Sequence, residues 1–127
     1  MADLTTIEGN QISFDPRTVA VVTDHDANTG ATVTSVYGVT SGILHIVEAV
    51  IPFLTRLGVE GNFATLTRPN DSAVWINGAS VSSLRSPLPG EFVGGVNTVL
   101  RVGSFTQGIR ELPAAAKTAL NACGANL

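Results

Sequence analysis

Few residues of this chain are of the types that carry out chemistry, and their spacing limits what each can do. His25 and His45, the two histidines, have no metal-ligand spacing between them. Asp24, Asp26 and Asn28 alternate as calcium ligands do, but the glycine and the closing glutamate of such a loop are misplaced, and an acidic turn explains the same residues. No nucleophile elbow or phosphate loop accompanies the serines. We therefore predict no catalytic residue, no metal and no cofactor.

The residues that remain are one tryptophan and two arginines in segments with strand character. If Val74 and Ile76 point inward, Trp75 points outward from its short strand. Arg101 lies on the open face of its predicted strand, and Arg85 begins the loop after another. An aromatic side chain and cations on a sheet are suited to stacking single-stranded bases and binding phosphates. Alternatively, the other half of the chain or a second subunit covers Trp75.

Composition narrows the class of protein. The 127 residues suffice for one domain, 1–127, and are 44% hydrophobic but only 13% charged. So few charges indicate that the surface is either covered by another copy of the chain or made of neutral polar residues. We expect the first arrangement, a homo-oligomer. The formal net charge of −3 argues against dense contact with a phosphate backbone. The amino-terminal residues lack a signal-peptide pattern and no apolar run is long enough to span a bilayer, so we expect a soluble, cytoplasmic protein.

The strands and helices that would position these residues follow one pattern that occurs twice in the chain. Shifting the chain on itself by about 63 residues superposes valines, glycines and glutamates, which predicts internal repeats at 9–62 and 72–126. In the first half we expect strands and a helix at 11–14, 18–23, 31–39, 43–46 and 47–57. Pro52 indicates that this helix begins near Ile51 or is kinked. In the second half we expect strands and a helix at 73–76, 80–84, 96–102, 105–109 and 110–122, and we treat 61–72 as the linker.

The predicted fold class is therefore α+β, with two tandem β-β-β-β-α repeats. Each repeat is too small to bury its own apolar face, so we expect antiparallel sheets that pack with the two helices as a pseudo-dimer. This order of elements resembles the repeats of the Pur-alpha family, and the Whirly proteins and the positive-cofactor transcriptional coactivators have related units. The resemblance covers nearly the whole chain as an order of elements. It implies binding of single-stranded DNA or RNA on the sheet faces, with Trp75, Arg101 and Arg85 in that role.

Three functions remain open at this point. The first is a non-enzymatic module that binds single-stranded nucleic acid. The second is a self-associating structural or assembly protein, which the low charge and the neutral Thr, Ser and Gly surface favour. The third, an enzyme, would need a cavity that gathers His45, Glu48 or Asp24 around a ligand.

Overall fold

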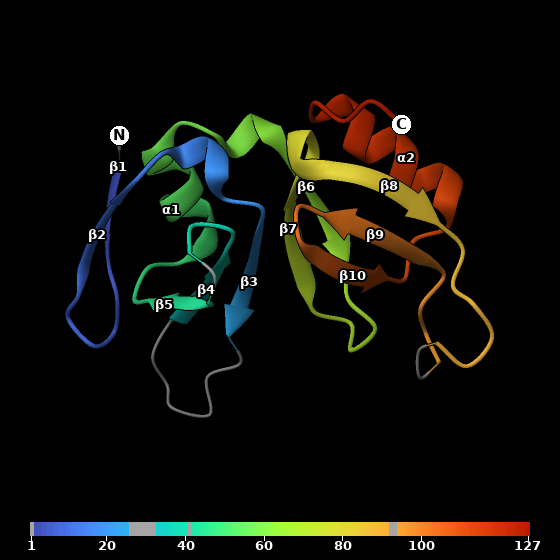
Figure 1. The fold of residues 1–127 in the computed structure, drawn as a ribbon, viewed down its shortest axis with the longest axis horizontal. Coiled ribbons are helices and arrows are strands. Elements are labelled where there is room, and N and C mark those ends of the chain that lie inside the picture. The colour runs from blue at the N-terminus through green and yellow to red at the C-terminus, as the bar shows by residue number, and fades with distance from the viewer. Residues whose placement is uncertain (1, 26–32, 41, 92–93) are drawn as a thin grey trace. The chain divides into compact units, whose positions relative to one another are not determined.

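The computed structural model describes residues 2–25, 33–40, 42–91 and 94–127 (Figure 1). Within these residues the chain is mixed α+β, with two α-helices and ten strands, and the strand pairs described below are antiparallel. The chain divides into two compact units, residues 1–61 and 62–127. Neither helix of the described residues has the length and the apolar run that a membrane-spanning helix needs.

Unit 1 consists of a hairpin, a three-stranded meander and a helix. The hairpin pairs β1 with β2, and the meander pairs β3 with β4 and β4 with β5. A bridge between Thr6 and Ile46 joins the end of the hairpin to β5. The elements are β1 (Ala2–Thr5), β2 (Gln11–Phe14), the 3₁₀ turn η1 (Pro16–Thr18), β3 (Val21–His25), β4 (Val33–Tyr37), β5 (Leu44–Ile46) and α1 (Val50–Leu57).

Unit 2 has its elements in the same order. The hairpin pairs β6 with β7, and the meander pairs β8 with β9 and β9 with β10. The N–H of Arg110, just after β10, donates to the Thr67 carbonyl at the end of β6. After η2 (Glu60–Asn62) the elements are β6 (Phe63–Thr67), β7 (Ala73–Asn77), η3 (Gly78–Ser80), β8 (Val81–Arg85), β9 (Thr98–Val102), β10 (Phe105–Ile109) and α2 (Pro113–Ala122).

The α+β class agrees with the sequence-based expectation, but the strand inventory differs from it. We expected four strands in each half, whereas each unit has five. The additional strands are β1, which precedes the predicted repeat, and β6, which lies in the segment taken as a linker. Helix α2 begins at Pro113, three residues later than predicted, and α1 begins at Val50, one residue before the start near Ile51 that Pro52 suggested.

Local side-chain chemistry explains several element boundaries. The Asp15 carboxylate accepts the N–H of Arg17 at 3.0 Å, and the Asn77 side chain accepts that of Ala79 at 3.1 Å, so each caps a 3₁₀ turn. Pro113 opens α2, where a missing N–H has no intrahelical partner to lose. Gly58 ends α1 in the left-handed region with φ 74°, and its N–H bonds the last turn.

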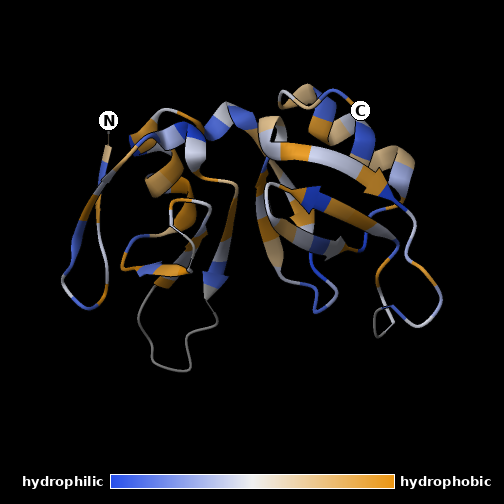
Figure 2. Ribbon diagram, viewed as in Figure 1, coloured by the Kyte–Doolittle hydropathy of each residue, from blue (hydrophilic) through white to orange (hydrophobic). Residues whose placement is uncertain are grey.

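The core is built mostly from β-branched and large apolar side chains on the strands and on one face of each helix. The ribbon coloured by hydropathy shows that hydrophobic residues recur along the strands and both helices (Figure 2). Helix α1 contacts β3, and α2 contacts β6 and β8. The largest fully buried side chains are Val19, Val22, Val36, Ile46, Phe53 and Leu54 in unit 1, and Val74, Ile76, Leu100, Val102, Ile109 and Leu120 in unit 2.

Candidate nucleic-acid interface

Arg85 and Arg101 lie on one face of the β8–β9–β10 meander. The register pairs Ser83 with Arg101 and Arg85 with Val99, so the two arginines are diagonal neighbours on adjacent strands. Thr106 on β10 pairs with Arg101 from the other side. These five residues, together with Leu100, line a hollow of about 270 Å³.

A β-bulge at Ser82 turns Arg85 to this face. Val81 pairs with Val102, but the next pair is Ser83 with Arg101, so Ser82 is the extra residue. Regular alternation from buried Val81 would point Arg85 toward the buried face. The bulge reverses the alternation, and both Ser83 and Arg85 are exposed. The sequence carries no clear signal for this bulge, and only the pairing with β9 reveals it.

Arg85 is held by an acidic side chain. Its Nη1 donates to Glu91 Oε1 at 2.7 Å, and its Nη2 bonds Glu91 Oε2. Hydrogen bonds from Arg85 and from the Leu88 N–H lower the pKa of Glu91 from 4.5 to about 2. The same hydrogen bond to Glu91 raises the pKa of Arg85. At neutral pH the pair is therefore fully ionised, and Glu91 offsets the charge that Arg85 presents.

Arg101 provides the more available cation. Its side chain is exposed, and its Nε donates to the Gly103 carbonyl at 3.1 Å. Among the residues that the structure describes, no carboxylate lies within ion-pair distance of Arg101. The hydroxyl-bearing residues Ser83 and Thr106 flank it in one cross-strand row. A guanidinium between two hydroxyl groups matches the donors that proteins direct at phosphate oxygens.

The third predicted residue is elsewhere in unit 2. Trp75 lies on β7, half-buried and opposite Thr65 of β6, between Val74 and Ile76, which are both fully buried. It is not among the residues that line the hollow beside Arg101. The fold thus brings together two of the three predicted residues, and any stacking by Trp75 would use a separate part of the surface.

The structure also adds one contact that the sequence did not indicate. Ser35 Oγ and His45 Nδ1 lie 3.0 Å apart across β4 and β5. Ser35 is only 4% exposed, and neither residue lines the hollow in unit 2 or the one in unit 1 described below. The arrangement fits a satisfied polar pair within a sheet rather than an accessible nucleophile.

Metal ligands can be assessed only in the described part of the chain. There, no group of three His, Cys, Asp or Glu side chains is placed to hold a metal ion. Of the acidic loop considered for calcium, Asp26 and Asn28 lie outside the described residues.

Comparison with protein-family models, with curated proteins and with solved structures gives no match for this chain.

Proposed function

We propose that this chain is a non-enzymatic module that binds single-stranded DNA or RNA through the face formed by Arg85, Arg101, Ser83 and Thr106. The observation that carries the proposal is the exposed Arg101 guanidinium, which lies between two hydroxyl-bearing residues in one cross-strand row. Arg85 adds a second cation to the same hollow. Such a surface binds the sugar-phosphate backbone and carries little base specificity.

A single strand suits this surface better than a duplex. The hollow is small, with a volume of about 270 Å³, and two cations line it. A duplex carries phosphates along two strands and is usually bound by a broad basic surface, whereas the chain as a whole has a net charge of −3. A flexible strand can instead bring one or two phosphates to Arg101 and Arg85.

Fluorescence anisotropy with a labelled mixed-sequence oligonucleotide tests the proposal at 50 and 200 mM salt. We expect weak, salt-sensitive binding that Arg101→Gln reduces. Arg17→Gln is the matched control, since Arg17 is an exposed arginine of unit 1 whose side chain is 87% exposed. Absence of binding at both salt concentrations, or equal losses in the two variants, would refute the proposed interface. Trp75 emission, recorded in the same titration, reports whether β7 also contacts the strand.

We also propose that the two units are tandem repeats of one β-β-β-β-β-α pattern. Their elements follow the same order, and matched hydrogen bonds recur at matched places. The hydroxyls of Thr34 and Thr98, one on each central meander strand, donate to the carbonyls of Glu48 and Glu111. Packing of the repeats as a pseudo-dimer is part of the same proposal. A small-angle scattering curve that fits two separate units on a flexible connection would argue against the pseudo-dimer.

Self-association is the second candidate function. Four of the exposed large apolar side chains belong to unit 1, and three of them, Ile43, Val47 and Ile51, lie within nine consecutive residues. Exposed apolar side chains that lie together often mark protein–protein contacts, and Ile7 and Val47 line the same hollow of this unit. Sedimentation velocity at micromolar concentration tests this candidate, with Val47→Ser expected to shift a dimer toward monomer. A monomer at all concentrations would remove the candidate and leave nucleic-acid binding unaffected.

A further inference from the structure

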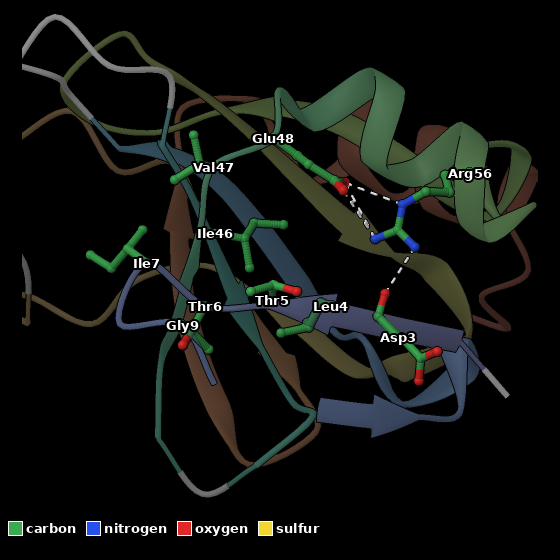
Figure 3. A pocket seen from close by; sticks show the side chains of 10 residues that line it. All are labelled: Asp3, Leu4, Thr5, Thr6, Ile7, Gly9, Ile46, Val47, Glu48 and Arg56. Carbon is green, nitrogen blue, oxygen red and sulfur yellow. Dashed lines mark hydrogen bonds and ion pairs between the residues drawn. The ribbon is translucent and has the colours of Figure 1, made fainter. Parts of the chain in front are cut away.

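A second hollow lies in unit 1, between β1 with the loop after it and the segment 46–48, with Arg56 of the last turn of α1 also lining it (Figure 3). Its volume is about 460 Å³, within the range of small-molecule sites. Thr5 and Leu4 lie on one side of it and the pair of Glu48 and Arg56 on the other. Ile7 and Val47, which are 50% and 62% exposed, also line it and supply apolar surface.

In unit 2, the threonine that corresponds to Thr5 binds a carboxylate. Thr67, the last residue of β6, donates its backbone N–H to Glu111 Oε1 at 3.0 Å and its hydroxyl to Glu111 Oε2 at 3.0 Å. One carboxylate thus binds a backbone N–H and a hydroxyl of the same threonine. This arrangement satisfies an edge N–H that the hairpin itself leaves unpaired.

Thr5 occupies the same position in the hairpin of unit 1. It ends β1 and pairs with Gln11, as Thr67 ends β6 and pairs with Ala73. Each hairpin then closes a loop of the same length, with the Thr6 N–H bonding the Asn10 carbonyl at 2.8 Å as the Arg68 N–H bonds that of Ser72 at 2.8 Å. The two threonines therefore have equivalent positions in their hairpins.

The Thr5 N–H points toward the hollow. Two residues earlier on the same strand, the Asp3 carbonyl accepts Arg56 Nη1 at 2.8 Å, on the side away from β2. Because backbone groups two residues apart on a strand point the same way, the Thr5 N–H faces that side too. Thr5 is exposed and lines the hollow.

The matching glutamate of unit 1 binds a different partner. The Glu48 carbonyl accepts the Thr34 hydroxyl, as the Glu111 carbonyl accepts that of Thr98, so the two glutamates have matching backbone positions. The Glu48 carboxylate, however, pairs with Arg56 at 3.2 Å, which holds it on the opposite side of the hollow. Among the described residues, no side-chain carboxylate bonds Thr5 as Glu111 bonds Thr67.

We propose that this hollow binds a small organic carboxylate with an aliphatic body. The carboxylate accepts the Thr5 N–H and hydroxyl in the manner of Glu111 on Thr67, and the aliphatic body contacts Ile7 and Val47. The lining carries the carboxylates of Asp3 and Glu48 against the single guanidinium of Arg56. Because this net negative lining opposes an anion, we expect a dissociation constant of about 1 mM rather than a tight complex. The proposal is independent of nucleic-acid binding by unit 2.

Titration of the ¹⁵N-labelled full chain with sodium hexanoate at constant ionic strength tests the site. The expected result is a saturable shift of the Thr5 amide signal. Thr5→Val keeps the backbone N–H and the shape but loses the hydroxyl, and it should weaken binding about tenfold, which is about 1.4 kcal/mol. Thr67→Val is the matched control in unit 2, and it should bind hexanoate as the unmodified chain does.

Three results would overturn the site. The first is the absence of a saturable shift at Thr5. The second is equal binding of hexanamide and hexanoate, since the proposal requires a carboxylate. The third is equal affinity of the Thr5→Val and Thr67→Val variants, which would remove Thr5 from the binding contacts.

Discussion

Replacement of Gly78 by alanine should destabilise unit 2 by forcing α2 away from η3. Gly78 is buried, and a Cβ atom built on it would contact the backbone carbonyl group at Cys123 and lie 2.8 Å from the Leu120 carbonyl oxygen. The Cβ to Cys123 carbonyl carbon distance would be 2.7 Å. These are backbone atoms at the end of α2, so no side-chain rotation can relieve the overlap.

The magnitude follows from the two ways in which the structure can respond. A shift of the α2 end by a few tenths of an ångström is overpacking, which typically costs about 1–3 kcal/mol. Lifting α2 far enough to uncover Leu120, which is fully buried, would approach the cost of losing a core leucine, about 2–5 kcal/mol. The smaller response prevails, and several simultaneous backbone overlaps place it at the upper end, about 2–3 kcal/mol.

Urea unfolding, followed by Trp75 fluorescence and by far-ultraviolet circular dichroism, measures this loss in the unit that contains both Gly78 and Trp75. Gly61→Ala is the matched control, since a Cβ there would meet nothing within 4 Å. A Gly78→Ala variant as stable as Gly61→Ala would show that α2 does not pack on η3 as described.

Three further outcomes follow from polar contacts. Thr98→Val should cost about 1–3 kcal/mol in urea unfolding, because the fully buried Thr98 hydroxyl donates to the Glu111 carbonyl at 2.6 Å. Glu91→Gln should release Arg85 and steepen the salt dependence of oligonucleotide binding by about 0.7 in logarithmic slope, whereas Asp15→Asn, which removes the same charge in unit 1, should leave it unchanged. The folded-state pKa of both carboxylates is lowered to about 2 from 4.5 and 3.8, so their stabilising effect is present above pH 4.5 and lost as the pH falls toward 2. Urea midpoints measured across that pH range should fall less in a variant that combines Glu91→Gln with Asp15→Asn than in the unmodified chain.

Short sequence patterns were sufficient to predict the ends of those strands and helices that are set by residues close to the boundary. Gly58 follows α1 directly and adopts a positive φ, as expected of a glycine that ends a helix. The segment at 11–14 forms β2 with the predicted bounds, and 105–109 forms β10. In these cases the turn residues and the alternation act within a few positions of the boundary, so a sequence pattern contains the necessary information.

Strands β1 and β6 depend on partners that the pattern does not reveal. Ala2–Thr5 and Phe63–Thr67 are short, and each is stabilised by pairing with the next strand of its hairpin. Strand propensity depends strongly on such cross-strand packing. The bulge at Ser82 has the same cause, because the extra residue is defined only against β9. The grouping of Arg85 with Arg101 therefore could not be derived from alternation alone.

The number of available cations sets the strength of nucleic-acid binding that the proposed interface can provide. Seven residues are Lys or Arg, and four of the arginines form the described ion pairs with Asp or Glu. On the proposed face, Arg101 contributes one phosphate contact and Arg85 contributes a second only after Glu91 is displaced. One to two contacts predict a logarithmic salt slope of about −0.7 to −1.4, so affinity should fall about 3- to 7-fold between 50 and 200 mM salt. A measured slope steeper than about −2 would require cations outside this face. Binding of that kind would have to be assigned to a different surface of the chain, with Arg101→Gln reducing it little.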